Sequence, residues 1–244
     1  MRRAGRPGQA RALARALVAF SAAAAGWLAV AGQGALGSAA LMPAPVEWRS
    51  VLQAASGRED PEGGLLRAAA YINLGRIVDA LDEVDALSRL AYRDLARVLV
   101  PQYEAAVKAS PGDLVALNCL AFGYYALDRM DSAIATLADL GQLDTSNPWP
   151  RNLLAIAYLA QEQVDAARAA AQEALRLDPS NQYSHLILAV AYYRKHDYLR
   201  FLAHYVRGRG AARELERYLK QRSGTQSQGV QSLPDRVEGD APGG

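Results

Sequence analysis

Residues 148–181 read PWPRNLLAIAYLAQEQVDAARAAAQEALRLDPSN, and their pattern recurs on both sides at one fixed interval. The motif Leu154-Ala155-x-x-Tyr158 returns 34 residues earlier as Leu120-Ala121-x-x-Tyr124 and 34 residues later as Leu188-Ala189-x-x-Tyr192. Self-similarity at one fixed period is the sequence signature of repeat architectures. The repeat therefore defines three units, 114–147, 148–181 and 182–215, before any single helix is assigned.

Each unit is predicted to form two helices joined by a polar turn. In 148–181, Leu154, Ala155 and Tyr158 share one face of a first helix at i, i+1 and i+4. A polar turn over 161–163 leads to a second helix over 165–176, and Pro179 follows the end of that helix. This second helix carries a stripe of small residues on one side, namely Ala167, Ala171 and Ala174.

These columns resemble the tetratricopeptide repeat family, whose pattern has Leu and a small residue, an aromatic residue, Ala in the second helix and a closing Pro. The resemblance implies an all-α fold, a right-handed α-solenoid of antiparallel helix pairs with a C-terminal capping helix. The unit 114–147 departs from the pattern at Thr145, where Pro is usual. The unit 182–215 departs further, because Phe201 and Gly208 stand at small-residue positions of its second helix. The last unit is therefore predicted to be a degenerate repeat.

The remaining segments are organised around these units. A divergent helix pair of the same type is predicted at 61–94, from Ala68, Tyr71, Gly75 and Ala80. An extra helix over 92–109 and a linker fill the interval 95–113, and a linker with a short helix near 47–55 occupies 37–60. The charged helix 211–222 is predicted to cap the last repeat. Residues 223–244 are rich in Gly, Ser, Gln and Pro and are predicted to be disordered, because they lack the apolar surface needed to fold.

The N-terminal residues 1–36 have the layout of a targeting segment. Five arginines and no acidic residue precede an uncharged run over 16–36. A positive region before an apolar run is typical of a secretory signal peptide. The 21 uncharged residues, at about 1.5 Å of rise each, are also long enough for a single transmembrane anchor. Both interpretations, and that of an organellar transit peptide, stay open. A transmembrane anchor or a signal peptide would place the chain that follows residue 36 outside the cytoplasm.

Composition and motifs predict no enzyme, cofactor or metal site. Cys119 is the single cysteine, which excludes an internal disulfide and a cysteine-based zinc site. His185, His196 and His204 do not form a ligand pair at helical spacing and are interpreted as ordinary surface histidines. The basic segment 194–222 could meet a polyanion or anionic lipid, but nucleic acid is not the predicted partner, because an exported protein does not meet it.

The predicted function is that of a non-catalytic interaction scaffold of the cell envelope. In the first helix of each unit, a column about 130° from the packing face carries large apolar, aromatic and Asn side chains. The resemblance implies that this column lines a concave groove, where it would bind a peptide segment of an unidentified protein partner. The predicted groove residues are Val115, Asn118, Phe122, Tyr125, Trp149, Asn152, Ile156, Tyr183, Val190 and Tyr193.

Three alternatives accompany this prediction. The helix 211–222 or the helix 92–109 could fold into the groove and bury the column. The protein could be a soluble cytoplasmic or organellar adaptor, with another purpose for residues 16–36. It could also be an enzyme or a small-ligand-binding protein on a helical array, which would require titratable groups that converge on the concave face.

Overall fold

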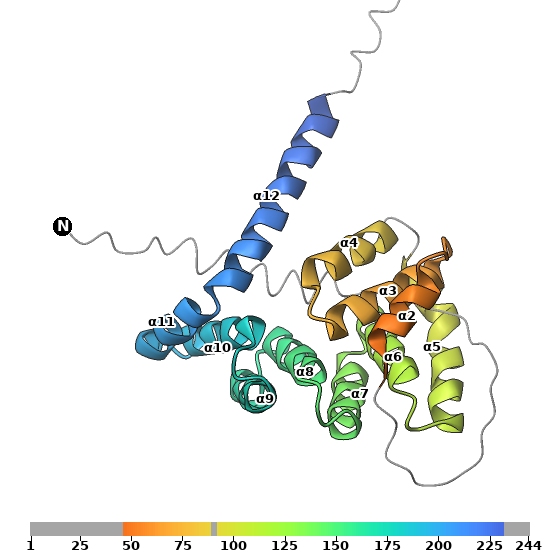
Figure 1. Cartoon of the computed structure of the whole chain (residues 1–244), viewed down its shortest axis with the longest axis horizontal. Helices are drawn as coiled ribbons and strands as arrows, with labels where there is room; N and C mark the ends of the chain where they lie inside the picture. Colours follow the sequence, from red (N-terminus) through yellow and green to blue (C-terminus); the bar gives the residue numbers. More distant parts are fainter. Residues whose placement is uncertain (1–45, 89–91, 232–244) are drawn as a thin grey trace, which may run out of the picture.

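The computed structural model describes residues 46–88 and 92–231, which form helices joined by short turns and contain no strand (Figure 1). Helix α2 (Trp48–Ala55) precedes the first helix pair, and α5 (Tyr92–Ala109) stands between the first and second pairs. The pairs are α3 (Pro61–Asn73) with α4 (Ile77–Ser88), α6 (Leu114–Ala126) with α7 (Met130–Leu143), α8 (Trp149–Ala160) with α9 (Val164–Leu177), and α10 (Gln182–Arg194) with α11 (Tyr198–Arg207). Helix α12 (Arg209–Gln231) follows. The prediction of an all-α solenoid of helix pairs is confirmed.

The turn inside each pair repeats the same backbone conformation. A residue with positive φ stands at the same place in every unit: Gly75 at 77°, Asp128 at 58°, Glu162 at 58° and His196 at 60°. The next amide in each unit reaches back to the tyrosine column, as Gln163 N does when it donates to Tyr158 O at 2.9 Å. The other three bonds are Arg76 N to Tyr71 O, Arg129 N to Tyr124 O and Asp197 N to Tyr192 O. A left-handed residue at a helix C-terminus provides carbonyls with donors in this way, so the divergent first pair shares the backbone register of the others.

An Asp or Asn side chain accepts backbone hydrogen bonds near the start of the first helix in every unit. The side chain of Asp113 accepts hydrogen bonds from Val115 N and Ala116 N, and Asn181 accepts one from Ser184 N. Asp60 and Asn147 occupy the same column and accept from Gly63 N and Trp149 N. Asp and Asn at this position satisfy amides that have no partner within the helix. Helices α3, α6 and α10 therefore begin at side-chain N-caps, whereas α8 has Pro148 as its N-cap and Asn147 one residue before it.

Small side chains bring the two helices of a pair together. Ala133 and Ala167 are 1% and 0% exposed, and Ala80 of the first pair is 1% exposed. The last pair has Phe201 in this column, and no residue of α11 is buried. The large ring at this position is the physical reason that α11 lies less deeply in the stack than the other second helices, as the departure from the repeat pattern predicts.

Gly208 ends α11 early and redirects the chain. A Cβ atom at this glycine would lie 2.8 Å from both Gln182 O and Leu186 N, so only glycine allows the backbone to approach α10 this closely. Helix α12 begins at the next residue, Arg209, instead of after a closing loop. Its residues Ala211, Ala212, Leu215 and Tyr218 are buried.

The predicted ends of the chain need one correction. Helix α12 continues to Gln231, so the predicted disordered tail cannot begin at 223. A helix that is already nucleated gains one hydrogen bond for each added residue, which offsets the low helix propensity of the Gly, Ser and Thr residues in this stretch. The N-terminal segment 1–36, the linker before residue 46 and the last part of the tail, 232–244, lie outside the described residues.

Candidate functional site on the concave face

The predicted groove residues lie together on one side of the solenoid, but most of them are covered. Figure 1 shows that α6, α8 and α10 face α3, α4 and α12, whereas α7 and α9 lie on the outer side. Six of the ten predicted residues are buried, namely Asn118, Phe122, Trp149, Asn152, Ile156 and Val190. Val115, Tyr125, Tyr183 and Tyr193 are partly buried. The column is therefore largely covered by other segments of the chain, and its role as a peptide-binding surface stays a prediction.

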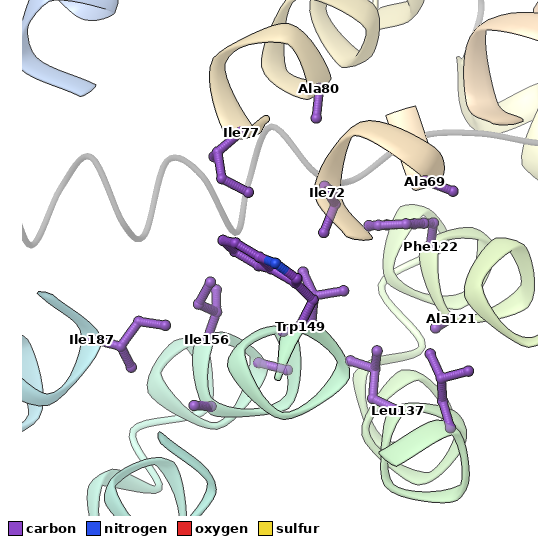
Figure 2. Packing of buried hydrophobic residues seen from close by; sticks show 14 of the residues in the cluster. Ala69, Ile72, Ile77, Ala80, Ala121, Phe122, Leu137, Trp149, Ile156 and Ile187 are labelled. Carbon is purple, nitrogen blue, oxygen red and sulfur yellow. The ribbon is translucent and has the colours of Figure 1, made fainter. Parts of the chain in front are cut away.

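The turn between α3 and α4 covers the middle of the column. Figure 2 shows the Trp149 indole between helix α8 and the side chains of Ile72 and Ile77, which come from the first pair. A Cβ atom at Gly75 would lie 3.4 Å from the indole. The positive φ of Gly75 and this close approach both favour glycine. Trp149, expected to anchor a partner, therefore anchors the first helix pair of its own chain.

A chain of side-chain amides strengthens the same contact. Asn73, the last residue of α3, donates to Oδ1 of Asn118 at 3.2 Å and accepts from Nδ2 of Asn147 at 2.7 Å. Asn118 is 1% exposed and donates its own Nδ2 to Leu114 O at 2.8 Å. The donor and acceptor of the Asn118 amide, one of the predicted groove residues, are thus both used within the chain.

Asn152, one repeat further along the column, is not fully satisfied. Its Oδ1 accepts a hydrogen bond from Ser184 Oγ at 2.8 Å, and the residue is 0% exposed. Its Nδ2 has no hydrogen-bond partner. A buried donor without an acceptor destabilises a fold by about 1–3 kcal/mol. Among the described residues, this amide is therefore the place on the concave face where an added acceptor would stabilise the protein most directly.

Helix α12 covers the far end of the column. Tyr183 Oη donates to Glu214 at 2.9 Å, and the Tyr183 ring packs against Trp149 with ring centroids 5.6 Å apart. Burial raises the pKa of the Tyr183 phenol, and the hydrogen bond to Glu214 raises it further. Of the two helices considered as possible covers, α12 does contact the column, whereas α5 packs beside α6.

Helix α12 also reaches the first helix pair. Arg222 forms an ion pair with Asp85 of α4, with 30% and 21% of the two side chains exposed. Its guanidinium also donates to Tyr218 Oη at 2.7 Å, and Tyr218 is buried. The C-terminal helix therefore crosses the concave side from the last repeat to the first and contacts both.

The described residues include one cysteine, Cys119, as a potential nucleophile. Cys119 is fully buried, and burial raises the pKa of its thiol to about 12, so it is a poor nucleophile at neutral pH. Among the described residues, no group of three or more His, Cys, Asp and Glu side chains is placed to hold a metal ion. None of the helices within 46–88 and 92–231 has the length and apolar character needed to cross a membrane.

Two histidines form a pair that the sequence analysis did not find, and the prediction of a surface position is wrong for His185, which is buried. His185 of α10 and His204 of α11 place their Nδ1 atoms 3.0 Å apart, and the His204 ring stacks on Tyr192. Burial lowers the pKa of both imidazoles, and the neighbouring Arg207 lowers them further. Their separation along the chain matches no ligand spacing, so only the packing of α11 on α10 reveals the pair.

Comparison with known proteins gives matches among solved structures alone. No protein-family model matches the chain, and no curated protein matches it. The structure described as MamA RS-1 ArsTM double mutant is 22% identical, covers 70% of this chain and 83% of its own, and has a TM-score of 0.44. The structure of MamA 41-end from Desulfovibrio magneticus RS-1 is 22% identical, with 70% and 84% covered and a TM-score of 0.43. A further structure of MamA is 16% identical, with a TM-score of 0.43.

Proposed function

We propose that this protein is a non-catalytic interaction scaffold of the cell envelope, which binds a peptide segment of a partner protein on the concave face of its helix pairs. The observation that carries the proposal is the orphan Nδ2 of Asn152. In the preceding repeat, the equivalent amide of Asn118 binds an amide of the chain's own α3. The column therefore already holds another segment of the chain through a pair of side-chain amides, and one position in it has a donor without an acceptor.

The partner segment would enter between α8, α10 and α12. There Tyr183 is partly buried, contacts Trp149 and donates to Glu214 of α12, so a movement of α12 would expose the Tyr183 ring. Trp and Tyr are frequent binding anchors. Release of α12 requires loss of its contact with α4, in which Arg222 and Asp85 form the ion pair, and of the bond from Tyr183 to Glu214. In this proposal α12 competes with the partner for the concave face.

The test uses the full chain and the partner that it captures. Asn152→Leu keeps the size of the side chain and removes the orphan donor, so partner affinity should fall while circular dichroism stays unchanged. Asp85→Asn removes the charge that holds Arg222, so partner affinity should rise. Asp94→Asn is the matched control, because its ion pair with Arg97 on α5 is largely exposed and distant in the chain from α12. Undiminished affinity in a folded Asn152→Leu variant would place the partner site elsewhere.

The location in the cell envelope is part of the same proposal. It is supported by the arginine-rich start of the chain and the uncharged run over 16–36. Such a segment would hold the scaffold at a membrane or export it, and the helical domain would meet its partner outside the cytoplasm.

A further inference from the structure

The outward side of α11 is apolar, which is the reverse of a normal surface helix. Leu199 is 85% exposed, and Leu202 and Val206 are 56% and 54% exposed. Tyr198 is also 56% exposed, and no residue of α11 is buried. By the helical step of 100° per residue, these four side chains and Ala203 span an arc of roughly 140°. We call this surface, formed by residues 198, 199, 202, 203 and 206, the α11 face.

Positive charge borders the α11 face, and negative charge is missing from it. Residues 198–213 contain Arg200, Arg207, Arg209 and Arg213 and no acidic residue. All four arginines are exposed. The nearest acidic side chain before this stretch, Asp197, is already bonded to the Arg200 backbone and side chain. An apolar helix face beside exposed arginines is the pattern of helices that lie in the interface of an anionic membrane.

Across the whole domain, too, positive charge is concentrated at the α11 end. Residues 46–193 contain 12 basic and 19 acidic side chains, whereas residues 194–222 contain nine basic and three acidic ones. The formal net charge is therefore −7 for residues 46–193 and +6 for residues 194–222. This asymmetry would turn the α11 end of the solenoid toward a negative surface and the earlier repeats away from it. A partner protein would need both an apolar site and a dense acidic rim to match, whereas an anionic bilayer supplies both without further assumption.

We propose that the α11 face docks on anionic phospholipid, a surface distinct from the concave face used in the proposed function. The helix lies on the membrane and does not span it, because 10 residues extend only about 15 Å. Leu199, Leu202 and Val206 would enter the boundary between headgroups and acyl chains, and Arg200 and Arg207 would contact phosphate. This contact is independent of residues 16–36, which would act as a separate attachment.

The experiment reports on α11 locally, so that attachment through the N-terminal segment cannot imitate it. An environment-sensitive fluorophore is placed on a Leu199→Cys variant of the full chain, where the native Cys119 is buried. Vesicles of phosphatidylcholine are compared with vesicles that also contain phosphatidylglycerol. A Glu173→Cys label on the exposed outer side of α9 is the matched control. We expect a blue shift and increased emission of the label at position 199 only when the vesicles contain phosphatidylglycerol. The label at position 173 should not change with either kind of vesicle.

The arginine contribution is tested on the same label. Arg200→Gln with Arg207→Gln should weaken the vesicle response by roughly 30-fold, since each basic residue near an anionic surface contributes about 1 kcal/mol. High salt should also weaken the vesicle response, because it screens the attraction between the arginines and the anionic surface. An unchanged label at position 199 with anionic vesicles would overturn the proposal. A blue shift that occurs without vesicles and grows with protein concentration would also overturn it, because a second copy of the chain would then cover the face.

Discussion

Single residues in the turns show how strongly the stack determines local conformation. Glu162 and His196 adopt positive φ, which residues with a side chain rarely take. The sequence marks this position with glycine only in the first pair, at Gly75. The bond from Gln163 N to Tyr158 O and the packing of the two helices compensate for the strain in the third pair. A polar turn is therefore predictable here, but its left-handed residue is not.

The alanine column predicts a test of overpacking. Ala167 is 0% exposed between α8 and α9, so Ala167→Leu should lower the free energy of unfolding by about 1–3 kcal/mol. Ala169→Leu is the matched control, because this alanine is exposed on the same helix and should change stability by less than about 0.5 kcal/mol. Urea denaturation of both variants measures the difference. Equal stability of the two variants would contradict the register of the helix pair.

Substitution of two glycines by alanine should change the stability of the protein in opposite directions. Gly208→Ala would place a Cβ atom 2.8 Å from backbone atoms of α10, so it should destabilise the protein by about 1–3 kcal/mol and loosen α12. Gly141→Ala lies within α7, where a Cβ atom would meet only the Arg151 side chain at 3.7 Å. It should stabilise the helix by up to about 1 kcal/mol. Thermal unfolding gives the two signs, and amide hydrogen exchange in α12 reports the loosening; a stabilising Gly208→Ala would refute the close approach.

At the scale of the element, the two histidines make the contact between α10 and α11 sensitive to pH. The lowered pKa values keep both imidazoles neutral in the folded chain at a pH where the unfolded chain binds protons. Stability should therefore decrease as pH falls below about 6.5, the ordinary pKa of histidine. Asp178 and the Pro179 backbone favour the charged form of His185, but burial and Arg207 oppose it.

Substitution of one histidine should reduce this dependence. His204→Phe retains an aromatic ring to stack on Tyr192 and removes a titrating group, so the loss of stability between neutral and acidic pH should be smaller than in the parent chain. His196→Phe is the control, because His196 is exposed in the turn before α11. Urea denaturation across this pH range measures both slopes. A slope that His204→Phe leaves unchanged would assign the acid sensitivity to other groups.

At the scale of the whole molecule, α12 and the first helix pair close the concave side from opposite ends. The α3–α4 turn at Gly75 packs against Trp149. Helix α12 accepts a hydrogen bond from Tyr183 through Glu214 and forms an ion pair with Asp85 through Arg222. These contacts join the first and last pairs, which no repeat pattern brings together. The inner face of the solenoid is therefore covered from opposite ends by its own first helix pair and by α12.

The two proposed attachments to membranes predict different salt dependence. If residues 16–36 remain on the protein as an anchor, the full chain should sediment with membranes and resist extraction by high salt. A chain that begins at Val46 should be soluble and bind anionic vesicles only at low salt, through the α11 face. Membrane fractionation and mass spectrometry of the mature N-terminus measure both. A full chain that is freely soluble with Met1 or Arg2 intact would contradict both anchor and export.

The sequence by itself determined the repeat, because close helix packing requires small residues at fixed positions and the spacing of 34 is visible without any structure. It also marked the weak unit, since Phe201 and Gly208 break the columns. Tertiary structure alone decided that Asn73 binds Asn118, that the α3–α4 turn covers Trp149 and that α12 reaches α4. These contacts join segments far apart in the chain, and a periodic pattern specifies only the packing of each repeat on its neighbour.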